Sequence, residues 1–344
     1  MANVLDIRRR IRSVRNTRQI TKAMKMMSAA RLRKAQDRAL AARPYAQMLT
    51  NVLKSLVTRA EIYDPETGEV KHRLLARRPE RNIALIVVTA DKGLAGAFNA
   101  NILKAAMRFL DTKNEQGVNI ESIGRKSRDF FRRRFPVRAP EATDRAGRLQ
   151  VISERFALPK IDFALAREIS GRVVEQYCNE EIDAVYLVYN EFKSVIAQRL
   201  VVDKVLPIAQ IGADGVAQAQ EQTLEQREAA AEAAKSAGVS LEAADTSEVD
   251  ARAAQFGAQQ VDYIYEQPPD ELFRGLLPKY VGIQIYRALL ESNAAEQAAR
   301  MTAMDSATNN ATDMIDRLTL TMNRVRQASI TKEIIEIVSG AAAL

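Results

Sequence analysis

The sequence that decides the fold is residues 283–339, IQIYRALLESNAAEQAARMTAMDSATNNATDMIDRLTLTMNRVRQASITKEIIEIVS. These 57 residues contain no glycine and no proline, and no aromatic residue follows Tyr286. Small or aliphatic residues recur at alternating spacings of four and three, which is the heptad repeat of a coiled coil. The repeat consists of Leu290, Ala294, Met301, Met304, Thr308, Ala311, Ile315, Leu318, Met322 and Val325, with Gln297 in the remaining position. We therefore expect a helix ~85 Å long at ~1.5 Å per residue, which needs a partner.

The opposite end of the chain predicts that partner. Residues 1–43 contain no glycine, proline or aromatic residue. Their apolar positions are Ile7, Ile11 and Val14, then Ile20, Met24 and Met27, then Leu32 and Ala35. The spacing slips between the first two groups, which predicts a stutter in the heptads.

The ends of this first helix have their own signals. Asn3 can cap its start, with Asp6 three residues later. Pro44 should interrupt the helix, which would resume through Leu49, Leu53 and Leu56. Two such seams can bury each other as an antiparallel pair if a globular domain brings the chain back. The alternative is two legs of an ordinary helical bundle.

The middle of the chain predicts that globular domain. Apolar runs and glycine turns indicate strands and helices in alternation, which is typical of a largely parallel sheet with right-handed crossovers. We expect strands at 82–89, 118–123, 183–190 and 195–206, and helices at 98–110, 125–135 and 161–179. The predicted fold class is α/β: a long antiparallel coiled coil of N- and C-terminal helices plus a central Rossmann-like α/β domain.

Composition divides the chain into five parts. Residues 213–258 are rich in alanine, glutamate and glutamine, and we expect an exposed helix at about 218–236 with the remainder mobile. The expected parts are the N-terminal coiled-coil helix 1–60, a loop insertion 61–81, the central domain 82–212, an acidic insertion 213–262 and the C-terminal coiled-coil helix 270–344.

Charge is concentrated in one helix. The formal net charge is +8, yet residues 1–43 hold 13 basic side chains against Asp6 and Asp37, a net of +11. One reading is a nucleic-acid-binding coiled coil, but no aromatic residues are interleaved for base stacking. Cys178 is the only cysteine, which excludes an internal disulfide and fits a reducing compartment. We also expect no secretory signal and no bilayer-spanning helix.

The sequence offers no catalytic, cofactor-binding or metal-binding constellation. Gly93 and Gly96 form a turn after a strand, but neither the dinucleotide nor the phosphate-loop pattern is present. The lone His72 lies in a charged loop without cysteine, histidine or carboxylate partners at metal spacing. A free-standing enzyme built on the middle domain is therefore disfavoured.

Three long segments resemble a known family. NTRQITKAMKMMSAARLRKAQ (16–36) is similar to the N-terminal signature of the gamma subunit of F-type ATP synthases. LLPKYVGIQIYRALLESNAAEQAARMTAMDSATNNA (276–311) and RQASITKEIIEIVSGAAAL (326–344) look like the C-terminal helix of that family. The turn GLAGAFNAN departs from the family's usual GLCGG, since Ala95 and Ala97 replace a cysteine and a glycine. The 61–81 loop and the 213–258 insertion are longer than the common bacterial pattern.

The resemblance implies a central rotor stalk that couples proton-driven rotation of the membrane ring to ATP synthesis. It would be non-catalytic by itself and need no cofactor. It implies one copy per complex, partners in the alpha and beta subunits, the epsilon subunit and the membrane c-ring, and no nucleic acid. The expected place is peripheral, on the cytoplasmic face of the bacterial inner membrane.

The resemblance also implies roles for individual residues. Met24 matches the coupling methionine of the family, followed by Lys25, and it should lie near an arginine that matches Arg300. Polar positions that contact the catalytic ring match Arg326, Gln327, Thr331, Glu333 and Glu336. The apolar tail from Ile330 to Leu344 would lie in a bearing at the top of the head. The alternative for Met24 is plain packing in the seam.

Overall fold

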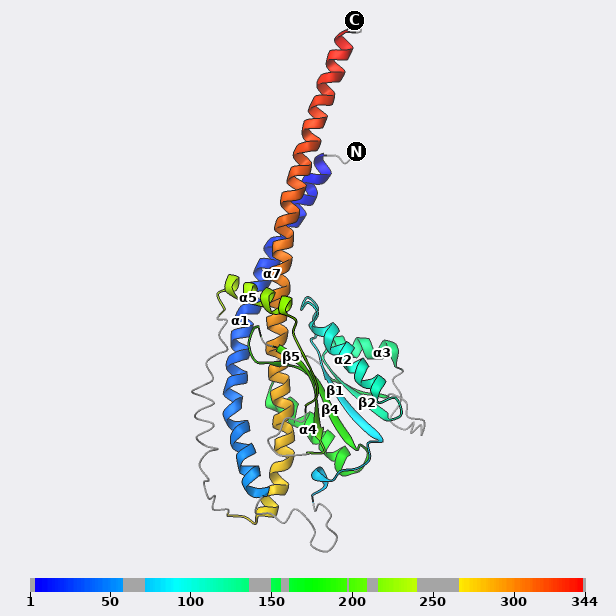
Figure 1. Cartoon of the computed structure of the whole chain (residues 1–344), viewed down its shortest axis with the longest axis vertical. Coiled ribbons are helices and arrows are strands. Elements are labelled where there is room, and N and C mark those ends of the chain that lie inside the picture. Colours follow the sequence, from blue (N-terminus) through cyan, green and yellow to red (C-terminus); the bar gives the residue numbers. More distant parts are fainter. Residues whose placement is uncertain are drawn as a thin grey trace.

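The computed structural model describes residues 4–57, 72–135, 150–155, 161–196, 198–208, 216–239 and 266–342. Two long helices lie side by side, and a sheet with its own helices covers the lower half of the pair (Figure 1). The upper half of the pair projects beyond the sheet, and α7 extends past the start of α1 (Figure 1). We call this helical pair the shaft.

Both shaft helices are longer than their apolar segments alone suggest. Helix α1 spans Val4–Val57 and passes through Pro44 without a break, and α7 spans Pro269–Ala342 and contains Pro278. The predicted interruption at Pro44 is therefore wrong. The lost backbone hydrogen bond is offset by packing, since the helix beyond this proline is buried at Leu49, Leu53 and Leu56. The expected cap at Asn3 lies outside the described residues.

The sheet has six strands in the order β3-β2-β1-β4-β5-β6. Their bounds are Asn82–Val88 for β1, Gly117–Ile123 for β2, Gln150–Arg155 for β3, Ala184–Phe192 for β4, Gln198–Leu206 for β5 and Val216–Glu221 for β6. The pairs β3-β2, β2-β1 and β1-β4 are parallel, whereas β4-β5 and β5-β6 are antiparallel. The sheet is therefore mixed rather than largely parallel. The connection from β4 to β5 is too short for a crossover, so this pair has to form antiparallel.

The two faces of the sheet bury different helices. Helix α2 (Phe98–Thr112) and α3 (Arg125–Arg134) share a core with Ile83, Leu85 and Val87 on one face. Helix α4 (Phe163–Cys178) and the lower part of α7 share a core with Ala84 and Ile86 on the other. A short helix, η1 (Arg73–Leu75), lies at the lower end of the sheet (Figure 1). The shaft base is thus part of the domain core.

The acidic insertion contains more regular structure than expected. The predicted helix at 218–236 is confirmed from residue 224 onward as α5 (Leu224–Ala237), whereas its first residues belong to strand β6. The alternation in VAQAQE was a strand signal of period two, weakened by its small and polar residues. Thr223 and Gln226 form a capping box that starts α5, and Gly238 ends it in the left-handed conformation. Helix α5 contacts both shaft helices.

Candidate functional site on the helical shaft

The predicted seam of α7 is confirmed. Met301, Met304 and Ile315 are buried, and the positions beyond them become half-buried toward the free end. At the upper end of the shaft an apolar cluster joins the helices, consisting of Ile7, Ile11 and Ile315 with Val14, Leu318, Met322 and Val325 packed against it.

The predicted seam of α1 is wrong in its middle. Ile20 is 60% exposed and Met27 is 53% exposed, whereas Thr21, Lys25 and Ser28 are buried. These polar residues continue the spacing of Ile7, Ile11 and Val14 without a slip, so no stutter is needed. The apolar residues looked like the seam because hydrophobicity was the only guide to the register.

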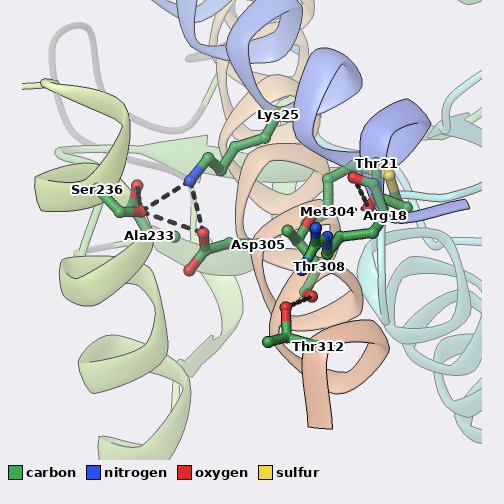
Figure 2. A network of polar contacts seen from close by, with 9 residues as sticks. All are labelled: Arg18, Thr21, Lys25, Ala233, Ser236, Met304, Asp305, Thr308 and Thr312. Carbon is green, nitrogen blue, oxygen red and sulfur yellow. Dashed lines mark hydrogen bonds and ion pairs between the residues drawn. The ribbon is translucent and has the colours of Figure 1, made fainter. Parts of the chain in front are cut away.

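Two polar contacts between α1 and α7 define the register of the pair (Figure 2). The hydroxyls of Thr21 and Thr308 lie 2.8 Å apart. Lys25 Nζ donates to Asp305 Oδ1 at 2.8 Å, and both side chains are less than one-tenth exposed, at 7% and 8%. Moving forward along α1 from Thr21 to Lys25 means moving backward along α7 from Thr308 to Asp305. The two helices are therefore antiparallel.

The residues assigned to coupling lie in this middle part of the shaft. Met24 is half-buried, and its neighbour Lys25 is buried in the ion pair. Arg300 is 7% exposed and pairs with Glu296 at 2.7 Å. The register places Arg300 about six residues, or ~9 Å, from the level of Met24 along the axis. Their direct contact stays a prediction.

The glycine turn after β1 packs against the shaft near Arg300. Arg300 Nη2 donates to the carbonyl of Gly93 at 3.3 Å. A Cβ atom on Gly96, whose φ is +53°, would lie 3.6 Å from Cβ of Ala303. The turn therefore joins the sheet domain to α7, which explains its small residues without a nucleotide.

A buried carboxylate accompanies this joint. Burial raises the pKa of Glu296, while the Arg300 guanidinium opposes that shift. Asp91 also raises the pKa of Glu296, and Arg31 lowers it. Charges from α1, α7 and the turn after β1 therefore meet here, which adds an electrostatic link between the domain and both shaft helices.

The second group of predicted residues lies near the free end of α7. Arg326, Gln327, Thr331, Glu333 and Glu336 are all exposed. Two contacts of these residues lie within the helix: Thr331 donates to the carbonyl of Gln327, and Glu336 lies 3.4 Å from a lysine one turn earlier.

Apolar side chains share this free end. They are 49% to 71% exposed and consist of Ile330, Ile334, Ile335, Ile337 and Val338. Isoleucines on a single projecting helix are typical of a surface that another protein covers. On α1, the arginines at positions 8, 9, 10, 12 and 15 are also exposed, so the upper shaft presents a basic side as well.

Three polar partners in the shaft region were not predicted from the sequence. They are Asp305, Glu296 and Ser236, and each belongs to a network that crosses between elements. The sequence contained only a weak sign of the Lys25–Asp305 pair. Lys25 follows Met24 and Asp305 follows Met304, so each charged residue is next to an expected seam residue. Among the described residues, no helix is long and apolar enough to cross a membrane, and no cluster of potential metal ligands occurs.

Sequence comparisons cover the whole chain. A family profile described as ATP synthase matches residues 3–344. The ATP synthase gamma chain of Solibacter usitatus (strain Ellin6076) is 50% identical over 343 residues, which is 100% of this chain and 99% of that protein. The ATP synthase gamma chain of Pelotomaculum thermopropionicum is 42% identical over 345 residues, and the match covers 100% of both.

Solved structures share the fold. A chain of the Euglena gracilis mitochondrial ATP synthase (OSCP/F1/c-ring) aligns with TM-score 0.53 and 18% identity, covering 99% of this chain and 94% of that one. A chain of the Tetrahymena thermophila mitochondrial ATP synthase (central stalk/c-ring) aligns with TM-score 0.50 and 21% identity, covering 84% and 99%. At these identities the likeness concerns the fold alone.

Proposed function

The chain belongs to the ATP synthase gamma chain family, and from this premise we propose that it is the central stalk of an ATP synthase. It couples rotation of a membrane ring to ATP synthesis on a catalytic head. The observation that carries this function is the projecting antiparallel pair of α1 and α7, rooted in a compact domain (Figure 1).

The geometry of the shaft suits a part that turns inside a sleeve. Its seam includes alanine, serine and threonine, whose small side chains let the two helices approach closely and keep the pair slim. Its upper surface is asymmetric, because α1 contributes exposed arginines while residues 281–344 of the C-terminal segment have a net charge of −1. Rotation therefore presents different surfaces to each catalytic subunit in turn, as coupling through distinct states requires.

The assignment extends to partners and location. The catalytic head consists of three alpha and three beta subunits, and the free end of α7 enters it. The sheet domain rests on the c-ring with the epsilon subunit beside it, one copy of the chain per complex. The chain carries out no nucleotide chemistry itself, and it lies on the cytoplasmic face of the bacterial inner membrane as a peripheral protein.

The assigned site residues form two contact zones with the head. Met24, Lys25 and Arg300 belong to the middle of the shaft. Lys25 and Arg300 are buried and support this zone from within, whereas the half-buried Met24 and the exposed Ile20 and Met27 provide its surface. The exposed polar positions from Arg326 to Glu336 belong to the free end of α7.

The middle zone can be tested by Met24→Lys. This change adds a cation next to Lys25 at a half-buried position. We expect weakened coupling: ATP hydrolysis continues while fewer protons are pumped per ATP. Proton pumping and hydrolysis measured together in membrane vesicles decide this, and an unchanged ratio would refute the role of Met24.

Reconstitution tests the function as a whole. A tagged chain co-expressed with alpha and beta subunits should retain both through purification at moderate salt. After addition of the c-ring, the complex should couple hydrolysis to proton movement. Retention of RNA or DNA that salt removes, with no alpha or beta subunit bound, would instead support the nucleic-acid-binding alternative, which none of the relatives described above supports.

A further inference from the structure

We propose that α5 is a clasp that fixes the register of the shaft, and that Lys25, Asp305 and Ser236 are its positioning residues. The proposal rests on the function above, because a fixed register matters to a shaft that transmits rotation. It concerns a helix within the acidic insertion, for which the sequence indicated no role.

The first step is the shared polar centre (Figure 2). Lys25 on α1 pairs with Asp305 on α7, and Ser236 at the end of α5 contacts both. Ser236 Oγ accepts from Lys25 Nζ at 3.1 Å. Its single hydrogen lies within reach of two acceptors, Asp305 Oδ1 at 3.1 Å and the Ala233 carbonyl at 3.0 Å. Three helices therefore meet in one hydrogen-bonded group.

The second step is the fit of α5 on the shaft. Its buried face consists of Ala230, Ala233 and Ala234, which are small enough for close packing against the two helices. The C-cap of α5 is also bonded to α1, since Arg33 donates to the carbonyl of Gly238. Val239, just after the helix, is also buried in the same core. Helix α5 is thus attached to α1 and α7 by both apolar and polar contacts.

The third step is that the apolar seam alone does not fix the register at this level of the shaft. A seam of alanines, methionines and threonines offers similar contacts when one helix shifts along the other. A buried polar pair does not, because a shift leaves each charge in an apolar seam without its partner. The polar layer formed by Thr21, Lys25, Asp305 and Thr308 is therefore what distinguishes the native register.

The fourth step is the position of the clasp. Helix α5 crosses the shaft at the level where the two helices leave the sheet domain and continue upward on their own (Figure 1). Torque from the domain enters the free part of the shaft at this level. A fixed register here means that turning the domain turns both helices together, rather than sliding one along the other.

Disulfide formation in the full chain measures the register directly. In a Cys178→Ser background, Thr21→Cys with Thr308→Cys reports the native register, because these hydroxyls lie 2.8 Å apart. Thr21→Cys with Thr312→Cys or with Met304→Cys reports displacement by one turn either way. Brief mild oxidation of each pair gives the ratio of native to displaced yield.

The clasp predicts how variants change that ratio. Lys25→Met and Asp305→Asn should each lower it at least about fivefold, and Ser236→Ala should lower it less. The charge exchange of Lys25→Asp with Asp305→Lys should restore much of it. Lys235→Ala, on the exposed side of α5, is the matched control and should leave the ratio unchanged. Equal ratios in the wild type and all three clasp variants would overturn the proposal.

A second readout links the register to function. In the assembled complex, the clasp variants should pump fewer protons per ATP hydrolysed than Lys235→Ala. Altered disulfide ratios with a normal pumping ratio would overturn the clasp as a coupling element. Failure of even the wild-type chain to bind alpha and beta subunits would contradict the proposed function instead, while the disulfide ratios would still decide whether the clasp exists.

Discussion

At the scale of single residues, Glu80 connects separate parts of the sheet domain. Its carboxylate accepts from Lys113 at 2.7 Å, Lys204 at 2.6 Å and the Tyr186 hydroxyl at 2.9 Å. Burial raises the pKa of Glu80, but these three hydrogen bonds outweigh it and lower the pKa to about 2. One ionised side chain thus holds the segment before β1, the end of α2, and strands β4 and β5 together.

Glu80→Gln should therefore destabilise the chain in a pH-dependent way. The pKa in the folded chain, about 2, is below the ordinary value of 4.5, so the ionised form stabilises the fold above pH 4.5. This contribution is about 3 kcal/mol at most, and about 1–2 kcal/mol once solvent screening of the partly exposed side chain is included; it is lost as pH falls from 4.5 toward 2. Urea unfolding of both proteins at several pH values measures it. Glu115→Gln, at an exposed position, is the control, and a difference that does not shrink on acidification would contradict the assignment.

Position 124 has room only for glycine. It connects β2 to α3 with φ of +95°, and a Cβ atom there would lie 2.1 Å from the carbonyl oxygen of Thr89. We expect Gly124→Ala to lower the free energy of unfolding by roughly 3 kcal/mol or more, because backbone must move. Gly171→Ala, in α4 with no atom within 4 Å of the added carbon, should instead stabilise by about 0.5–1 kcal/mol. Equal changes in melting temperature for Gly124→Ala and Gly171→Ala would contradict this explanation.

Single residues were the least predictable part of the shaft. The heptad of α7 could be predicted because its seam is nearly all small or aliphatic. In α1 the seam passes through Thr21, Lys25 and Ser28, while Ile20 and Met27 point outward. No hydrophobic pattern can predict a polar seam, since the burial of Lys25 depends on Asp305, which lies 280 residues later.

At the scale of elements, the free end of α7 contrasts with every other helix of the chain's described part. From Arg326 to Ser339 all residues are exposed, including five large apolar ones. Such a helix owes its stability to the length of the helix below it rather than to packing. Its apolar surface is left for another protein to cover.

Deleting residues 330–344 should therefore separate folding from assembly. The isolated chain should keep its melting temperature within about 2 °C, because residues 330–339 are all exposed. Binding to the head should weaken at least tenfold, since each isoleucine that becomes buried contributes on the order of 1.5–3 kcal/mol. Calorimetry and titration with the alpha–beta head measure the two effects. A large drop in melting temperature would show that the free end stabilises the chain itself.

Most elements of the central domain were predictable, and the exceptions have physical reasons. Strand β1 is a continuous apolar run and was predicted within one residue at its end. Strand β6 was missed because its apolar positions are mostly alanine, and β3, Gln150–Arg155, because most of its short segment is polar. The passage of α1 through Pro44 could not be predicted, since it depends on burial of the following leucines by the domain.

At the scale of the whole molecule, the shaft and the domain are one mechanical unit. The lower part of α7 lies in the core under one face of the sheet, and Ala29 and Leu32 of α1 share the core of the other. The turn after β1 contacts α7 through Arg300, and α5 crosses both helices. A domain connected at several levels can turn the shaft without rotating around it.

Rotation of the complex tests this account most directly. A bead attached at Asp111→Cys, an exposed position on α2 in a Cys178→Ser background, reports the motion of the sheet domain above an immobilised head. With ATP, the bead should turn continuously in one direction and stop when ATP is removed. ATP hydrolysis by the same complexes with a stationary bead would contradict the claim that this chain is the rotating stalk.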